Sequence, residues 1–301
     1  MTLNNNINNN ILKNIIVKYK NILKEKNFDT YSLDVELLLM HSTNLSKTDL
    51  YLNPNYELTS SQLNLFEDCF NRRLKKEPIA YILGKWEFMG LEFLLDSNTL
   101  IPRPETELLV ETTLEIINNL NLNNINILDM CTGSGAIAIA LAKYINISNT
   151  SIVASDLNKK ALDMAKQNAK LNNVNNIKFV ESDLFNNLDV NNKFNIIVSN
   201  PPYIKSSDIP TLEANVKEYE PVLALDGGKS GLIFYEQIVA NSKNYFNNNN
   251  NNLNNNYLIF EIGYNQAEDL KNMLLKNGFD DNNIKIIKDF SNLDRVVVAK
   301  I

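Results

Sequence analysis

The chain has 301 residues, of which 44% are hydrophobic and 21% charged, as in a soluble globular protein with one large domain or a large and a small one. Its net charge of −6 at pH 7 argues against binding of nucleic acid phosphates through a broad basic surface. No apolar run approaches the roughly 18 residues of a membrane span, and residues 1–4 lack the features of a signal peptide. We therefore expect a soluble cytoplasmic protein that contacts neither membrane nor nucleic acid directly.

Few side chains are available for metal binding or nucleophilic catalysis. The two cysteines, Cys69 and Cys131, lie far apart, and no Cys-x-x-Cys pair occurs. The single histidine, His41, lies in an apolar helical pattern, where a place on a helix face is its ordinary explanation. A disulfide framework, a thiolate zinc site and a Ser-His-Asp triad are all poorly supported. We predict no metal site.

Asparagine is unusually frequent, with 53 copies, and it dominates the tracts 4–10 and 247–256. Such tracts bury too little apolar surface to offset their ordering entropy. We expect them to be disordered or mobile surface insertions without a function of their own.

The first part of the chain, residues 1–77, has a helical pattern. From residue 11 onward apolar side chains recur at intervals of three and four, as in Leu63, Phe66 and Phe70, which predicts a small N-terminal helical bundle. Residues 78–104 look extended, with glycines as turns, and predict a hairpin that links two domains. Pro102 and Pro104 force an extended stretch before a helix that opens at Glu105.

The rest of the chain, residues 105–301, alternates short β-branched runs with amphipathic helices, which predicts a mostly parallel sheet with helices on both faces. Ligands of such sheets bind beyond the carboxyl ends of the strands. The expected strands are 125–130, 151–155, 177–181, 194–199, 257–262, 284–287 and 295–300, and the expected helices lie near 135–145, 158–172, 229–245 and 265–277.

A glycine-rich turn follows the first of these strands, in the run Cys131-Thr132-Gly133-Ser134-Gly135. Glycines there let a ligand approach the backbone, and the helix N-terminus offers free N–H groups. Asp156, at the end of the next strand, is suited to accept ribose hydroxyl groups of a dinucleotide or of S-adenosylmethionine. Asp183, followed by Leu184, either receives an adenine amino group or caps a short turn. These features predict a nucleoside cofactor and leave its identity open.

The run Ser199-Asn200-Pro201-Pro202-Tyr203 directly follows the fourth strand. The prolines fix the backbone and remove two donors, so that carbonyl oxygens point outward. Asn200 adds an amide acceptor and Tyr203 an aromatic face, which together form a slot for a planar –NH2 group. Here the sequence resembles S-adenosylmethionine enzymes that methylate amino groups. We assign catalysis to Asn200, Pro201, Pro202 and Tyr203, and cofactor binding to Cys131, Thr132, Gly133, Ser134, Gly135, Asp156, Asp183, Leu184 and Asn200.

Further segments resemble the protein-(glutamine-N5) methyltransferases that modify peptide chain release factors: residues 34–39, 72–84, 100–107 and 220–228. The resemblance extends from about residue 33 to residue 298. It implies a seven-stranded, mostly parallel, Rossmann-like S-adenosylmethionine methyltransferase sheet with a small helical domain that helps to recognise the substrate. It also implies that a monomeric enzyme methylates the glutamine amide in the Gly-Gly-Gln motif of class I release factors. Arg103 and Glu105 are expected to shape the pocket entrance.

One position departs from the family pattern, since Cys131 stands where the family usually has glycine. A side chain at this turn is expected to narrow the cofactor pocket. The slot also fits the amino group of adenine, so the alternative function is an N6-adenine methyltransferase acting on DNA or RNA. The acidic charge and the lack of a large basic recognition domain argue against that alternative. A dinucleotide oxidoreductase or a non-catalytic binding protein on the same sheet is a third interpretation.

Overall fold

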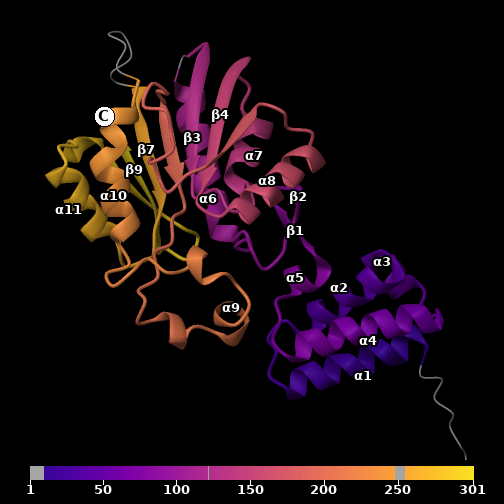
Figure 1. The fold of residues 1–301 in the computed structure, drawn as a ribbon. Helices are drawn as coiled ribbons and strands as arrows, with labels where there is room; N and C mark the ends of the chain where they lie inside the picture. Colours follow the sequence, from indigo (N-terminus) through magenta and orange to yellow (C-terminus); the bar gives the residue numbers. More distant parts are fainter. Residues whose placement is uncertain (1–9, 121, 248–254) are drawn as a thin grey trace, which may run out of the picture. The chain divides into compact units, whose positions relative to one another are not determined.

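The structure is a computed structural model that describes residues 10–120, 122–247 and 255–301 (Figure 1). The chain divides into two compact units, Met1–Gly84 and Lys85–Ile301. Most of both asparagine tracts lies outside the described residues. At one end of the second tract, however, Asn256 is fully buried and donates from its side chain to the carbonyl of Asn247 at 2.9 Å. The expectation of a mobile surface segment is therefore wrong for Asn256.

The first unit is helical, which confirms the predicted N-terminal bundle. Tyr19 packs edge-on against Phe66 and Phe70, with ring centroids 4.8 and 4.6 Å apart, in the core of the bundle. Ser46 and Thr59 begin two of the helices with reciprocal capping boxes. From residue 10 onward this unit contains five helices: α1 (Leu12–Glu25), α2 (Tyr31–Thr43), α3 (Lys47–Leu52), α4 (Ser60–Leu74) and α5 (Ile79–Leu83).

The extended conformation expected for residues 79–83 is wrong, because this segment forms the short helix α5. Pro78, which can precede a helix without losing a hydrogen bond, begins it, and Gly84 ends it at φ 70°. The hairpin follows in the second unit, as β1 (Lys85–Phe88) and β2 (Leu91–Leu94). Its two turn residues, Met89 and Gly90, both have a positive φ, which is the geometry of a type I′ turn.

A seven-stranded sheet forms the centre of the second unit, in the order β5-β4-β3-β6-β7-β9-β8. Only β9 is antiparallel to its neighbours among these strands, as the predicted mostly parallel sheet requires. All seven strand predictions are confirmed to within two residues at each end. The strands are β3 (Asn124–Met130), β4 (Asn149–Asp156), β5 (Ile177–Glu181), β6 (Ile196–Ser199), β7 (Tyr257–Glu261), β8 (Ile284–Lys288) and β9 (Asp294–Lys300).

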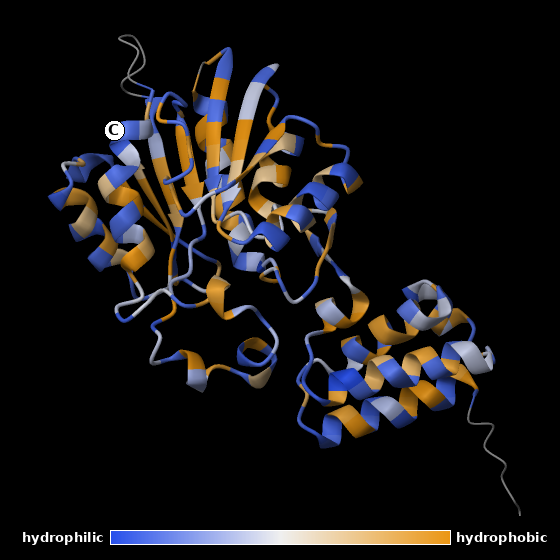
Figure 2. Ribbon diagram, viewed as in Figure 1, coloured by the Kyte–Doolittle hydropathy of each residue, from blue (hydrophilic) through white to orange (hydrophobic). Residues whose placement is uncertain are grey.

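Helices cover both faces of this sheet, and the strand interiors are correspondingly hydrophobic (Figures 1 and 2). Alternate residues of β3 face opposite layers: Ile127 packs in the cluster that includes α6 and α7, and Leu128 in the cluster of α10 and α11. The α-helices of this unit are α6 (Pro104–Asn119), α7 (Ala136–Tyr144), α8 (Lys159–Leu171), α9 (Ala214–Lys217), α10 (Ile233–Ser242) and α11 (Ala267–Lys276). Short 3-10 helices occur at η1 (Ile209–Thr211), η2 (Val222–Ala224), η3 (Lys243–Tyr245) and η5 (Asp281–Asn283).

Candidate functional site

A pocket lies at the carboxyl ends of β3, β4 and β6. Strand β3 starts the sheet, the chain then continues outward to β4 and β5, and it returns to the other side of β3 at β6. The pocket therefore opens where the strand order reverses, which is the general ligand position of such sheets. Seven of the predicted site residues line it: Cys131, Gly133, Asp156, Asp183, Leu184, Asn200 and Pro202.

The turn after β3 uses its two glycines for different purposes. Gly133 has φ 55°, and a Cβ built there would meet no atom within 4 Å, so its backbone borders open pocket space. Gly135 has φ 83°, and a Cβ there would lie 2.9 Å from Cδ1 of Ile139 and 3.0 Å from Cβ of Ala165. The first glycine thus admits a ligand, whereas the second permits close packing of α7 and α8.

Asp129, near the end of β3, holds this turn in place through hydrogen bonds. It is completely buried, and its Oδ2 accepts hydrogen bonds from Thr132 Oγ1 at 2.5 Å and from the backbone N–H of Ala138 at 3.1 Å. Burial raises the pKa of Asp129 to about 7 in spite of these two bonds. Thr132 and Ser134 are also buried and do not line the pocket. They shape the turn from inside.

Cys131 lines the pocket from a backbone with φ 62°, a region in which a side chain is strained. Burial, followed by the nearby Asp156 carboxylate, raises the pKa of its thiol. The thiol is therefore protonated at neutral pH, which gives no support to a nucleophilic role.

Asp156 joins the glycine turn to the start of α8. Its Oδ2 accepts from the backbone N–H of Gly133 and its Oδ1 from that of Asn158, both at 2.8 Å. Burial raises its pKa, and these backbone bonds oppose that effect. Each oxygen retains acceptor capacity toward the pocket, because a carboxylate can take about four hydrogen bonds.

Asp183 and Leu184 border the pocket from the end of β5. Leu184 has φ 48°, so the chain turns sharply there. Asp183 is exposed, and its Oδ2 accepts from Nδ2 of Asn186 at 3.2 Å. The Asp183 carboxylate is therefore accessible from the pocket, and one of its oxygens also accepts the hydrogen bond from Asn186 within the turn.

The loop of residues 200–203 is clamped on both sides. Ser199 Oγ donates to the carbonyl of Met130 at 2.6 Å, which ties the end of β6 to that of β3. Nε2 of the buried Gln266 donates to the carbonyls of Tyr203 at 3.0 Å and Gly231 at 3.1 Å. Gly227 lies so close that a Cβ there would be 2.8 Å from Cα of Tyr203. The loop backbone is therefore rigid before any ligand binds.

Not every residue of that loop faces the pocket. Asn200 and Pro202 line it, whereas Pro201 and Tyr203 do not. Tyr203 packs against the hydrophobic cluster of α10 and α11, and burial raises the pKa of its hydroxyl group. An aromatic wall contributed by Tyr203 to a substrate slot stays a prediction.

Two distant segments also contribute to the pocket wall: residues 98–100, and Pro221 with Leu223 and Ala224. Arg103 Nη2 donates to Oε1 of Glu220 at 2.5 Å, and the backbone N–H of Ile101 donates to its Oε2 at 3.4 Å. The Glu220 side chain is almost completely buried, whereas that of Arg103 is 33% exposed. This ion pair holds the two wall segments together, which agrees with the expectation that Arg103 shapes the pocket.

Sequence reasoning missed several residues of this site. Residues 98–100 and Phe234 carry no local motif that marks them as pocket residues. Glu261 was also missed, although it ends the buried strand β7 in the way that Asp156 ends β4. A carboxylate at the end of an apolar strand run was the available signal. Within the described parts of the chain, no group of three or more His, Cys, Asp or Glu side chains is arranged to hold a metal ion, and no helix is long and apolar enough to cross a membrane.

The sheet order, the glycine turn and the strand-end acids define a class of α/β proteins with a pocket for a nucleoside cofactor. The fold is shared with the hMettl16 catalytic domain, solved in complex with the MAT2A 3′UTR hairpin 6, at TM-score 0.56 and 16% identity over 77% of this chain and 81% of that one. A family model for the PrmC N-terminal domain matches residues 14–84, and a methyltransferase small domain matches residues 105–249.

Curated relatives narrow this class. The release factor glutamine methyltransferase of Clostridium acetobutylicum is 39% identical over 96% of this chain and 98% of its own length. That of Flavobacterium psychrophilum is 40% identical over 84% of this chain and 86% of its own. The chain belongs to the release factor glutamine methyltransferases.

Proposed function

We propose that this protein transfers a methyl group from S-adenosylmethionine to the side-chain amide nitrogen of the glutamine in the Gly-Gly-Gln motif of class I release factors. It acts as a cytoplasmic monomer, and the helical unit Met1–Gly84 contributes to recognition of the release factor. The observation that carries the proposal is that Asn200 and Pro202, at the end of β6, line the same pocket as Gly133 and Asp156. Family membership supports the same reaction.

The pocket suits S-adenosylmethionine. Open space beside Gly133 leaves room for the cofactor against the backbone of the turn. Asp156 supplies carboxylate acceptors for the ribose hydroxyl groups, and Asp183 supplies one for the adenine amino group. When bound, S-adenosylmethionine supplies an electrophilic methyl group on a sulfonium sulfur.

The chemical task of the chain is to activate a poor nucleophile. The lone pair of an amide nitrogen is delocalised, so positioning has to provide much of the rate enhancement. In our proposal Asn200 Oδ1 and the Pro201 carbonyl accept the two N–H bonds of the glutamine amide, which increases electron density on nitrogen and aims it at the methyl group. Such positioning can contribute about 7–11 kcal/mol. The S–CH3 bond would break as the N–CH3 bond forms, and the methylated nitrogen would then release one of its two protons to water. No strong base is therefore needed before attack, which suits a site without histidine.

The decisive experiment compares substrates. Purified wild-type protein with S-adenosylmethionine should add one methyl group to the Gly-Gly-Gln glutamine of an intact release factor, as seen by peptide mass spectrometry. A release factor with glutamate at that position should stay unmodified, because glutamate lacks both N–H donors. Methylation of an adenine in an oligonucleotide, with the release factor untouched, would refute the proposal in favour of a nucleic-acid enzyme.

A variant tests the role of the slot. Asn200→Ala should abolish turnover and leave the dissociation constant of S-adenosylmethionine within a few fold, because the amide addresses the acceptor substrate. Calorimetry that shows cofactor binding lost together with activity would refute this assignment.

A further inference from the structure

Glu261, the last residue of β7, is a buried carboxyl group to which the mechanism above gives no role. Its exposure is 1%, and its Oε2 has no hydrogen-bond partner among the described residues. The polar side chains of Thr106 and Asn200 lie beside this carboxyl group, and each lowers its pKa. Asn200 Nδ2 in turn donates to Thr106 Oγ1 at 3.3 Å. Glu261, Thr106 and Asn200 thus form a polar cluster beside the pocket, in which Asn200 and Thr106 are joined by a hydrogen bond.

This group settles which end of the Asn200 amide faces the acceptor substrate. A carboxylate only accepts hydrogen bonds, so Asn200 must direct its –NH2 toward Glu261 and Thr106. Its Oδ1 then points away from them. We propose that Glu261, acting with Thr106, is a positioning residue that holds Asn200 with Oδ1 toward the substrate amide; this inference rests on the proposed function.

The surroundings of Glu261 come from four elements. Burial raises the pKa of Glu261 to about 7. The side chains of Thr106 and Asn200 and the positive charge of Arg295 lower this pKa, whereas the negative charge of Glu105 on α6 raises it further. Two phenols also face it: Tyr203 lies within electrostatic range, and the Tyr235 hydroxyl donates to the Glu261 carbonyl at 2.8 Å.

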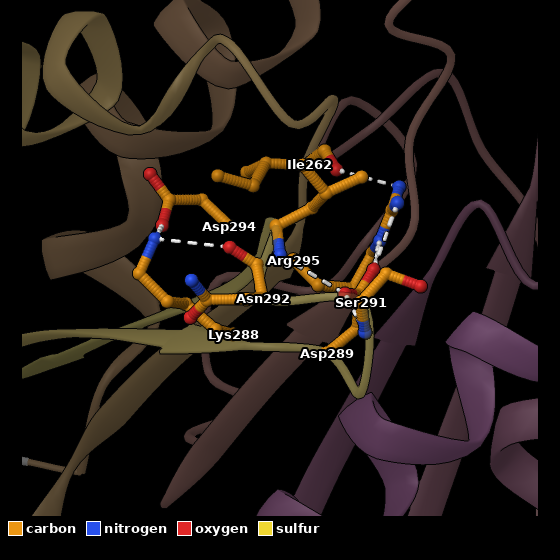
Figure 3. A network of polar contacts seen from close by, with 8 residues as sticks. Ile262, Lys288, Asp289, Ser291, Asn292, Asp294 and Arg295 are labelled. Carbon is orange, nitrogen blue, oxygen red and sulfur yellow. Dashed lines mark hydrogen bonds and ion pairs between the residues drawn. The ribbon is translucent and has the colours of Figure 1, made fainter.

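Arg295 is itself fixed in place (Figure 3). Its guanidinium donates to Oδ2 of Asp289 at 3.2 and 3.3 Å and to the carbonyl of Ile262, the residue after Glu261, at 3.4 Å. A cation held so close to the end of β7 favours the ionised form of Glu261.

The protonation state of Glu261 has a consequence for turnover. A protonated carboxyl group is also a donor, and it can then bond Asn200 Oδ1 and turn the –NH2 toward the substrate. We therefore expect kcat to rise with pH through about 7 as Glu261 ionises. Asp129 has its pKa in the same range, so the profile of a Glu261 variant has to be compared with that of the wild type.

The test measures methylation of the intact release factor by four proteins: wild type, Glu261→Gln, Thr106→Val and Thr113→Val. Thr113 is the control, because it is a fully buried threonine on the same helix whose hydroxyl bonds the carbonyl of Leu109 at 2.7 Å. The first two variants should lose about 10- to 100-fold in kcat, with KM for the release factor and Kd for S-adenosylmethionine within about threefold. Thr113→Val should turn over at the wild-type rate. Glu261→Gln should also lose the rise of kcat near neutral pH.

A double variant separates positioning from general damage. If Glu261 and Thr106 act together on Asn200, the double variant Glu261→Gln/Thr106→Val should lose no more kcat than the more damaging of the two single variants. Full activity of Glu261→Gln, or a parallel loss of cofactor binding and thermal stability, would overturn the inference. Inactivity of the wild-type protein on the release factor would instead overturn the proposed function.

Discussion

Asn168 on α8 offers a sharp test of how the hairpin and the glycine turn are held together. Its side chain is completely buried. Oδ1 accepts from the backbone N–H of Leu94 at 2.7 Å, and Nδ2 donates to the carbonyls of Leu94 at 3.0 Å and Ser134 at 2.9 Å. One amide thus extends β2 in the manner of a neighbouring strand and at the same time bonds the glycine turn.

We expect Asn168→Ala to destabilise the second unit by about 3 kcal/mol, since three hydrogen bonds are lost at roughly 1 kcal/mol each. For a unit of this size that corresponds to a fall in Tm of about 6–12 °C. Cofactor affinity should fall as well, because residues 98–100, which follow the hairpin, and the glycine turn both border the pocket.

The assay is thermal unfolding with and without S-adenosylmethionine, together with calorimetry of cofactor binding. Gln167→Ala is the matched control, since Gln167 is the exposed neighbour whose side chain bonds the carbonyl of Asp163 in its own helix at 3.3 Å. Its stability should change by less than about 0.5 kcal/mol. A loss below 1 kcal/mol in Asn168→Ala, or a full loss of stability at unchanged cofactor affinity, would refute this reasoning.

Three further changes have defined outcomes. Asp156→Ala should weaken S-adenosylmethionine binding by about 1–3 kcal/mol in calorimetry. An unchanged Kd would show that Asp156 has only a structural role, as a cap of the local backbone. Cys131→Gly should stabilise the protein by about 1 kcal/mol in urea unfolding, because it relieves a strained positive φ, and a destabilised variant would contradict that. Although burial raises the pKa of Glu36, bonds from Lys20, Tyr51 and Lys47 lower it to about 2. The stabilisation that Glu36 provides is therefore complete above its unfolded pKa near 4.5 and is lost as the pH falls toward 2. In acid unfolding, Glu36→Gln should reduce the loss of unfolding free energy across that pH window by on the order of 2 kcal/mol.

The sheet was predictable because its signals are local. Each strand is a short β-branched run, and burial on both faces makes such runs continuous, as in Ile196–Ser199. The helix α5 was not predicted, since the five residues between Pro78 and Gly84 are apolar in a way that suits a strand as well as a helix. Only the Pro-before and Gly-after arrangement distinguishes the two.

The site was predictable only where its residues follow a strand. Cys131, Asp156 and Asn200 do, and parallel strands bring their ends to one edge of the sheet. The wall that Arg103 and Glu220 hold together joins segments more than a hundred residues apart, and no periodicity or motif encodes such a pairing. Tyr203 shows the reverse case: its motif is local, but packing against the α10 and α11 cluster decides where its ring lies.

Three acids at strand ends show how one fold feature serves separate tasks. Asp129, Asp156 and Glu261 lie at the carboxyl ends of β3, β4 and β7, and burial raises the pKa of each. Only Asp156 lines the pocket, so only it can bind the cofactor directly. Asp129 bonds Thr132 and Ala138 and so fixes the glycine turn, and we propose that Glu261 in the same way fixes Asn200 together with Thr106. Desolvation at the sheet edge strengthens the hydrogen bonds that these carboxylates accept, and in our proposal the groups they orient form the cofactor turn on one side and the substrate slot on the other.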